Sequence, residues 1–495
     1  MALITLPPEL KLNIADCLDP DSTLNFALTC KDHATLFKSL LGQHARLLAE
    51  WKVIDTTDAR TLLWEILRDI IASPRLGWYI RELNLPPSRQ YNWNANESLF
   101  DPHPKNGVGP TEEDKALFIE AARGLQDLYP GFGVENLRLQ RRYSHTIRFL
   151  PRPYDTIGSI EDRIHAGFED AIIAILLHYL PYLTTIRHSE VAMEDCLELV
   201  LWQIALGYKD PLKAPKLPLQ RLKTVSLRYA LGEGCSSPDW ACFYLSIPSV
   251  KTFAAQAMGG SPSEDVLRTL FPKGAAPCSN VVELFFRYCV FDVDGLATIL
   301  ANIRHLEKLA YNGGGAEVCE SSFYEPKRVI RAIATHASRS LEELMLSEED
   351  TDSEPPEDGP AIISLREFQK LRVLHCSWPM LRPEPGKEED LDHDEPLEQG
   401  YYQKEDYEQI DVDFDVRTIL PESLEELFMN GYFDAYEEWD YMENAFKAPS
   451  AFTPRLTLEK TCIQNGDWSD RIGTAEAPDG VWSHPLGRLF EGHDI

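Results

Sequence analysis

The chain has 495 residues, of which 44% are hydrophobic and 10% aromatic, so it can bury more than one sizeable core and is not a disordered polymer. It carries 48 Lys and Arg against 79 Asp and Glu, which gives a formal net charge of -31. This charge argues against nucleic acid and against a membrane surface as partners. The first residues lack the pattern of a signal peptide, and no run of about 18 uncharged apolar residues occurs. We therefore expect a cytoplasmic or nuclear protein.

The ten cysteines are scattered along the chain, with no Cys-x-x-Cys pair and no nearby paired histidines. This spacing predicts no zinc site and no other bound metal. In a reducing compartment, isolated cysteines most often serve as small apolar residues of a core.

The first fifty residues are predicted to form three short helices. Leu6, Leu10, Ile14 and Leu18 recur every four residues, which places them on one face of a helix, and residues 19–22 break that helix and offer an N-cap for the next. A module of this size buries too little apolar surface by itself, so we expect a partner to cover part of it. The second helix carries Leu24 and Leu28, and the third carries Phe37, Leu40, Leu41 and Leu47.

Residues 4 to 40 also contain a recognisable series of short phrases. These are Leu6-Pro7-Pro8-Glu9-Leu10, Ile14, Leu18-Asp19, Leu24, Leu28 and Thr29-Cys30-Lys31. The series resembles an F-box, the motif that binds the Skp-type adaptor of SCF ubiquitin ligases. The resemblance implies that eight residues face the adaptor or the core of the module: Leu6, Pro7, Leu10, Ile14, Leu18, Leu24, Leu28 and Cys30.

Two positions depart from the F-box pattern. His33 stands where many members of that family have Trp, and Ala27 stands where a larger apolar residue is frequent. Both departures predict a weaker adaptor interface than usual. The alternative interpretation is that these helices only cap the next domain.

One short phrase recurs beyond this module: an apolar residue, two variable residues, then two apolar residues separated by one more. The period of two within the phrase predicts a short strand with one buried face. Successive copies are 25 to 53 residues apart, which makes the repeat irregular. The eight copies begin at Leu183, Leu222, Val250, Val281, Leu306, Leu341, Leu371 and Leu424, and a looser copy begins at Ile80.

Helical patterns lie between the phrases, at 168–180, 197–206, 296–303 and 327–337. Each unit is therefore strand, loop and helix. Such units stack into a leucine-rich-repeat solenoid, with parallel strands on the concave face and helices outside. The stretch 66–83 is also similar to the segment that comes directly after the F-box in fungal F-box proteins with leucine-rich repeats.

The predicted fold class is α/β, with a small three-helix F-box followed by an irregular leucine-rich-repeat solenoid. The boundaries are 1–50 for the F-box-like module, 51–79 for a helical linker, 80–447 for the solenoid and 448–495 for a C-terminal cap or tail.

Two acidic segments interrupt the predicted solenoid, at 347–360 and 384–415. The first has seven acids and no bases, and the second has fourteen acids against Lys387 and Lys404. Low apolar content and charge repulsion predict exposed loops at both places. Ser347 and Thr351 stand before acids and are candidate phosphorylation sites.

The residues that alternate with the buried positions of each phrase should point into the concave space, where solenoids commonly bind. Basic residues dominate the early half of this surface, and Arg can grip a carboxylate or phosphate through two hydrogen bonds. We therefore expect an acidic or phosphorylated protein substrate. The alternative is that these cations pair with neighbouring acids and that the aromatic residues pack on loops. The predicted substrate-binding residues are Arg187, Arg228, Phe285, Arg287, Lys308 and Phe428.

No motif of catalysis is found. Gly232 to Ser237 lacks the last glycine of a dinucleotide loop, Asn312 to Gly315 is predicted to be a turn after a strand, and no P-loop, Gly-x-Ser-x-Gly or His-Glu-x-x-His phrase occurs. We expect no catalytic residue and no cofactor. The resemblance implies a non-enzymatic substrate receptor that binds a Skp-type adaptor and a cullin-RING ligase. The alternatives are a scaffold that acts outside the ligase, and a hydrolase or transferase without a local motif.

Overall fold

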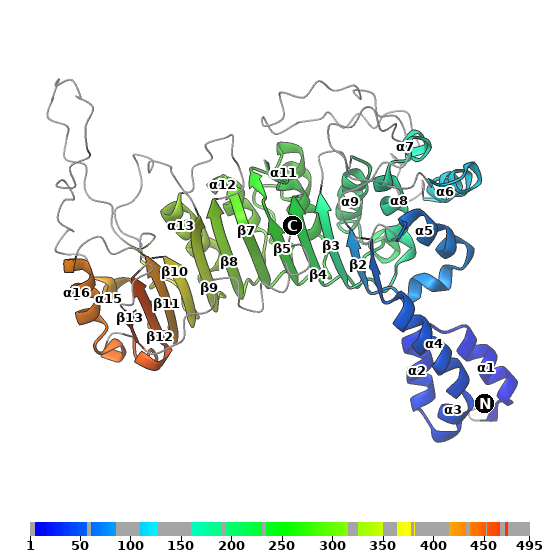
Figure 1. Ribbon diagram of the computed structural model, residues 1–495, viewed down its shortest axis with the longest axis horizontal. Helices are drawn as coiled ribbons and strands as arrows, with labels where there is room; N and C mark the ends of the chain where they lie inside the picture. Colours follow the sequence, from blue (N-terminus) through cyan, green and yellow to red (C-terminus); the bar gives the residue numbers. More distant parts are fainter. Residues whose placement is uncertain are drawn as a thin grey trace. The chain divides into compact units, whose positions relative to one another are not determined.

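The computed structural model describes residues 5–56, 61–85, 109–125, 160–190, 195–229, 234–314, 325–349, 364–377, 381, 415–431, 436–451, 453–465 and 471–473. The fold is α/β, as predicted (Figure 1). The chain divides into two compact units. The N-terminal unit comprises Met1–Ala255 with Pro262–Asn280, and the C-terminal unit comprises Gln256–Ser261 with Val281–Ile495.

The N-terminal unit begins with four helices, here called the N-terminal module: α1 (Pro8–Asp16), α2 (Pro20–Leu28), α3 (Lys31–Leu36) and α4 (Lys38–Trp51). The predicted third helix is therefore two helices. The break falls at Phe37, whose backbone (φ -91°, ψ 4°) leaves the helical region. Helix α4 leads from the module to the first strand (Figure 1).

Five strands of the N-terminal unit follow one another in chain order: β1 (Val53–Asp55), β2 (Glu82–Leu85), β3 (Thr185–Glu190), β4 (Thr224–Tyr229) and β5 (Thr252–Gln256). Strands β1 to β4 are parallel, and their register aligns Ile54, Leu83, Ile186 and Val225 in one row. All four side chains are buried. Because strand side chains alternate between two faces, this row fixes which face of the strands carries the core.

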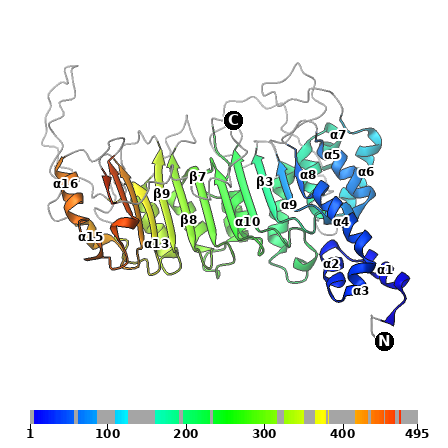
Figure 2. The same ribbon diagram turned by 60° about the horizontal axis from the view of Figure 1, so that its bottom comes forward.

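Helices of this unit lie against the strands on one side (Figure 2). Helix α5 buries Leu63, Trp64, Leu67 and Ile70 and leaves Asp69 exposed, as expected for an amphipathic helix. The helical segments after the module are α5 (Leu63–Ala72), η2 (Pro74–Trp78), α6 (Glu112–Gly124), α7 (Ile160–Ala166), α8 (Glu169–Leu176), η4 (Leu177–Tyr179), α9 (Asp195–Gly207), η5 (Ala214–Lys216), α10 (Asp239–Leu245) and α11 (Glu264–Leu270).

The C-terminal unit has the same plan. Its parallel strands run in the order β7 (Glu283–Phe291), β8 (Lys308–Gly314), β9 (Glu343–Glu349), β10 (Val373–Ser377), β11 (Glu426–Gly431) and β12 (Thr461–Asn465). Short β6 (Gly259–Gly260) pairs with β7, and β13 (Arg471–Ile472) is antiparallel to β12. The register aligns a buried leucine row, Leu284, Leu309, Leu344, Leu374 and Leu427.

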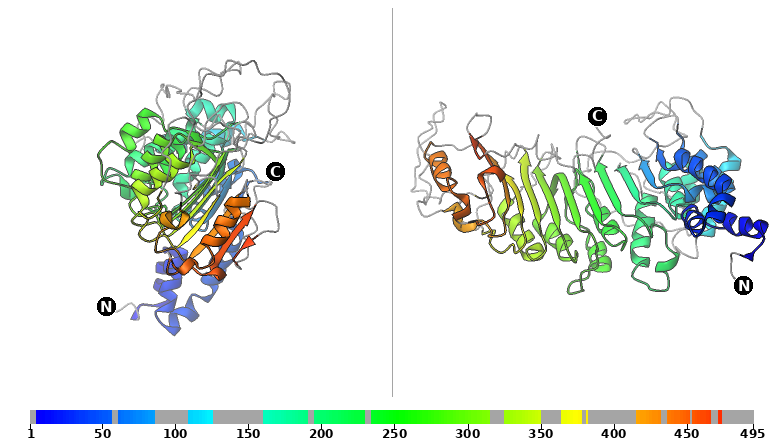
Figure 3. Two further views of the ribbon diagram at one scale, coloured as in Figure 1. Left: turned by 90° about the vertical axis from the view of Figure 1, so that its left-hand side faces the viewer. Right: turned by 90° about the horizontal axis from the view of Figure 1, so that it is seen from below.

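The helical segments of this unit are α12 (Val293–Ala301), α13 (Pro326–Ala337), α15 (Val416–Ile419), α16 (Tyr436–Ala445), η6 (Pro449–Ala451) and η7 (Leu458–Lys460). Helix α13 buries Val329, Ile330 and Ile333 and exposes Arg328 and Arg331, so its apolar stripe faces the core. In the end-on view of Figure 3, the green helices lie on one side of the strands and the orange helix α16 is seen in front of them.

Every predicted phrase is confirmed as a strand that begins two residues after the start of the phrase, from Ile80 with β2 to Leu424 with β11. Four of the described strands were not predicted: β1, β12 and the two-residue strands β6 and β13. Strand β1 lies in the segment expected to be a helical linker, and β12 and β13 lie in the expected cap or tail. The turn predicted at Asn312 is also wrong, because β8 continues to Gly314. The acidic segments lie almost wholly outside the described residues, as do Thr351 and Gly232.

Candidate functional site

Helix α1 turns its large apolar side chains away from the rest of the N-terminal module. Pro8 occupies the first turn of the helix, where proline is tolerated, and the buried residues of the helix are Lys11 and Ala15. Leu10 is 48% exposed and Leu12 is also exposed. The leucines of this helix therefore face solvent, whereas Lys11 and Ala15 face the interior of the module.

An open apolar depression of about 390 Å³ lies on this helix. Its lining residues follow helical spacing from Leu10 onward, so they share one face of α1. Aliphatic side chains and one thiol dominate the lining, which suits it to receive apolar side chains rather than a charged ligand. The lining residues are Leu6, Leu10, Asn13, Ile14, Cys17 and Leu18.

Helix α2 presents two more leucines to solvent, Leu24 at 47% and Leu28 at 72% exposure. Asp19 fixes the start of this helix by accepting hydrogen bonds from the backbone N–H groups of Asp21 and Ser22. Burial opposes ionisation of Asp19, but hydrogen bonds from Ser22, Tyr182 and Asp21 outweigh it and hold the pKa of Asp19 below its usual value.

The module has a small core that leaves these leucines out. Ala15, Ala27 and Phe37 are buried at its centre, with Phe26, Leu36, Leu40 and Leu41 packed around them. His33 is buried as well, with its ring 4.7 Å from that of Phe26 and its Nδ1 2.8 Å from Thr29 Oγ1. His33 and Ala27, the two departures from the F-box pattern, are therefore core residues rather than parts of the exposed apolar surface.

The eight residues predicted to face an adaptor or the core fall into two groups. Pro7, Leu10, Leu24 and Leu28 are exposed, and Leu6, Ile14, Leu18 and Cys30 are half-buried. Cys30 starts α3, where its Sγ accepts a hydrogen bond from the N–H of His33 at 3.5 Å. Asn13 and Cys17 line the depression and were missed, although their spacing from Leu10 on one helical face would have identified them.

Charged and aromatic contacts hold the module on the strands of its own unit. Asp21 on α2 lies 3.8 Å from Arg81 and 3.7 Å from Arg221. Both guanidinium groups lie over the ring of Tyr182, at 4.9 Å and 4.0 Å from its centroid, and Tyr182 donates its hydroxyl hydrogen bond to Asp19. Sequence patterns gave no signal for this cluster, because its members are far apart in the chain.

The predicted substrate-binding cations lie on the side of the strands opposite the leucine rows, but two of them are already paired. Arg187 Nη1 lies 3.2 Å from the Glu82 carboxylate on the neighbouring strand. In the C-terminal unit, Lys308 Nζ lies 3.7 Å from Glu283 and 3.6 Å from Glu343, which flank it on both sides. Neighbouring acids thus offset these charges, as the alternative interpretation of the sequence held.

The remaining predicted residues do not form an exposed basic and aromatic face either. Arg287 lies over the ring of Tyr288, 4.7 Å from its centroid, and donates to its hydroxyl group at 3.1 Å. Arg228 is half-buried. Phe285 and Phe428 are only 1% and 8% exposed, so the prediction of accessible aromatic anchors is wrong at both positions.

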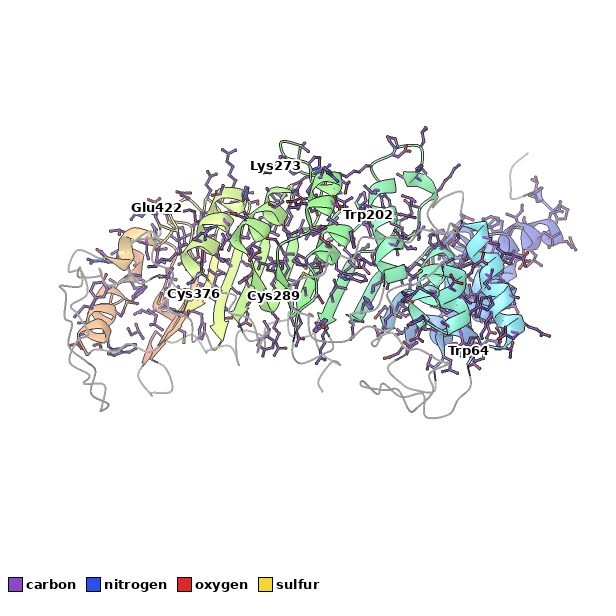
Figure 4. All side chains as sticks on the ribbon, turned by 90° about the horizontal axis from the view of Figure 1, so that it is seen from above. Trp64, Trp202, Lys273, Cys289, Cys376 and Glu422 are labelled. Carbon is purple, nitrogen blue, oxygen red and sulfur yellow. The ribbon has the colours of Figure 1, made fainter. Side chains whose placement is uncertain are left out.

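Among the described residues, no group of three or more His, Cys, Asp or Glu side chains is placed to hold a metal ion. Cys289 and Cys376 are buried on β7 and β10 (Figure 4), and burial raises the pKa of each thiol to about 12. These cysteines are core residues, as predicted, and are poor nucleophiles.

A second depression, of about 560 Å³, lies in the C-terminal unit, and three of its five charged lining residues form ion pairs. Arg372 lies 3.4 Å from Glu342 and 3.5 Å from Glu425, and Arg455 lies 3.3 Å from Glu425.

None of the helices in the described part of the chain combines the length and apolarity needed to cross a bilayer.

Comparison of the sequence with protein-family models gives no matching family, and comparison with curated proteins gives no match.

Proposed function

We propose that the chain is a non-enzymatic substrate-recognition subunit of an SCF-type E3 ubiquitin ligase. The N-terminal module acts as an F-box that binds a Skp-type adaptor, and the strand–helix units act as an irregular leucine-rich-repeat solenoid that holds the target protein. Ubiquitin transfer belongs to the partners. The contribution of this chain is to keep lysines of the target at a high effective concentration near the ubiquitin-charged enzyme.

One observation carries this proposal, namely that the module leaves its leucines uncovered while it has a core of its own. Leu10, Leu24 and Leu28 are exposed, and the core is built from Ala15 and Phe37 with their neighbours. Full burial of one leucine side chain yields about 1.5 to 3 kcal/mol. A protein that covers these leucines and fills the depression on α1 would therefore gain substantial binding free energy without unfolding the module.

The attachment of the module supports the same function. Asp21, Arg81, Arg221 and Tyr182 link α2 to the segments that lead into β2, β3 and β4, and these contacts favour a restricted orientation of an adaptor bound to the module. A receptor that works by proximity needs this geometry, because a target held loosely spends little time near the ubiquitin-charged enzyme.

Co-purification of the tagged full-length chain tests the proposal against its alternatives. Recovery of a Skp-type adaptor together with a cullin is the expected result. Recovery of the adaptor without cullin contradicts the ligase assignment and supports a scaffold. Recovery of neither, together with turnover of a small molecule, contradicts the receptor altogether and supports an enzyme.

A further inference from the structure

Basic residues lie at the beginning of the strands in the N-terminal unit. Backbone hydrogen bonds join Lys52, Arg81, Thr184, Lys223 and Lys251 in series: Arg81 N–H donates to Lys52 (2.9 Å), Thr184 to Arg81, Lys223 to Thr184 and Lys251 to Lys223 (2.8 Å each). The five residues therefore hold equivalent positions on strands about 4.8 Å apart. In Figure 1 this is the lower end of β2, β3 and β4, from which the N-terminal module extends.

The repeat itself does not require basic residues at this position. In the C-terminal unit the same series of backbone hydrogen bonds joins Val282, Glu307, Glu342, Arg372 and Glu425. Three of these five are acids, and the arginine lies between two of them. The basic character is thus specific to the N-terminal unit.

A hydrogen-bonded loop that leads into β4 presents one leucine to solvent. The Tyr208 hydroxyl donates to the Pro218 carbonyl at 2.5 Å, which closes the loop, and Asp210 Oδ1 accepts from the N–H of Leu212 at 2.9 Å. Leu212 is 84% exposed, more than any other large exposed hydrophobic residue described. Its side chain gains free energy when a partner covers it.

Bases outnumber acids in the segment that carries most of this surface. Residues 208–229 contain six bases and one acid, in a chain whose net charge is -31. Lys213, Lys216, Lys223 and Lys251 are exposed, and none of the four has an ion-pair partner within the described part of the chain. This differs from Lys308, which lies between two glutamates.

We propose that this basic edge, formed by Lys223 and Lys251 at the beginning of the strands together with Lys213, Lys216 and Leu212 of the loop that leads into β4, is the docking surface for an acidic segment of the target protein. The target assignment rests on the proposed receptor function. Most of the chain repels an acidic partner, so electrostatic attraction is concentrated where unpaired lysines gather, and Leu212 adds an apolar contact. The proposed target-binding surface is therefore at the beginning of the strands, and not on the strand faces expected from the sequence.

A protein segment fits this surface better than a nucleic acid does. Binding of nucleic acid draws its free energy from many phosphate contacts, and the net charge of -31 opposes the approach of a long polyanion. Leu212, the most exposed large apolar residue described, is aliphatic and offers no ring for a base to stack on.

Fluorescence anisotropy with a short labelled polyglutamate peptide tests the proposal. The triple variant Lys213→Glu, Lys216→Glu, Lys223→Glu should bind the peptide on the order of tenfold more weakly at low salt, and the difference should shrink as salt is added, because screening weakens exposed charges. The matched control is Lys370→Glu, Lys447→Glu, Lys460→Glu, which changes the net charge equally at exposed lysines of the C-terminal unit and should bind closer to wild type.

Circular dichroism and retained adaptor binding establish that the triple variant is folded. Equal peptide binding by the edge variant and the control would overturn the proposal. Tighter binding of a single-stranded oligonucleotide than of the peptide, lost in the edge variant, would also overturn it in favour of nucleic acid. If the wild-type chain binds the peptide but no adaptor, the receptor function fails while the acidic-segment site stands.

Discussion

Gly77 stands where a larger side chain does not fit. A Cβ atom at this position would lie 1.9 Å from the carbonyl oxygen of Tyr179, so η2 and η4 pack backbone to backbone. We expect Gly77→Ala to lower the free energy of unfolding of the N-terminal unit by about 1 to 3 kcal/mol, the usual cost of overpacking. Thermal unfolding of the full chain measures the effect.

Gly42 supplies the matched control. It lies within α4, and a Cβ atom there would meet nothing within 4 Å. Gly42→Ala should raise stability by about 0.5 to 1 kcal/mol, because alanine loses less backbone entropy in a helix. If both substitutions destabilise equally, the close approach at Gly77 is refuted.

The cysteines provide a second prediction at the scale of single residues. Cys17 is exposed in the apolar depression, whereas Cys289 and Cys376 are buried with thiol pKa values of about 12. Iodoacetamide should modify Cys17 within minutes under native conditions and leave the other two unmodified, even at pH 9, because the thiolate is the reactive form. Peptide mass spectrometry reads the pattern. Rapid modification of Cys289 or Cys376 would show that the strands open readily.

At the scale of elements, the cap of α2 makes the N-terminal module sensitive to acid. The folded state holds the pKa of Asp19 below its ordinary value of 3.8, so its ionised form stabilises the module above that pH, and this stabilisation is lost as the pH falls through the folded pKa. Because the side chain is largely solvated, we expect a modest effect.

The Asp19→Asn variant distinguishes the helix-capping role of the Asp19 side chain from the effect of its ionisation. Asparagine caps helices well, so the variant should match wild type at pH 7 and lose less stability as the pH falls below 3.8. Asp19→Ala should cost about 1 kcal/mol already at pH 7. Hydrogen exchange of α2 peptides measures both. Identical acid sensitivity in wild type and Asp19→Asn would show that other carboxylates control the module.

In every predicted strand, aliphatic or aromatic residues fill the first two buried positions of the phrase, and the third is apolar in all but β3, where it is His188. Strands β1 and β12 were missed for one reason. In β1 the third position is Thr56, and in β12 the second is Thr461, both fully buried with hydroxyl groups that donate to the carbonyls of Asn84 and Thr457. A hydrogen-bonded threonine thus replaces an aliphatic residue in the core, which an apolar pattern does not detect.

At the scale of the whole molecule, the apolar surface was predictable and the charged one was not. Helical spacing alone indicated that leucines of α1 and α2 share exposed faces. The charges of the strands depend on neighbours across the sheet, such as Glu82 beside Arg187, which lie more than a hundred residues apart in the chain. A single sequence does not reveal such pairs. For the same reason, the sequence does not show which lysines, such as those of the basic edge, are without an acidic neighbour.

The central claim is that the leucines of the N-terminal module form the binding surface for a Skp-type adaptor. Isothermal titration calorimetry of the full-length chain with a purified adaptor tests it most directly. Leu10→Asp combined with Ile14→Asp should weaken binding at least about tenfold, or 1.4 kcal/mol, because it places charges in an apolar interface. Leu458→Asp, at an exposed leucine of the C-terminal unit, should leave binding unchanged. No binding by the wild type, or equal binding by the double variant, would contradict the account.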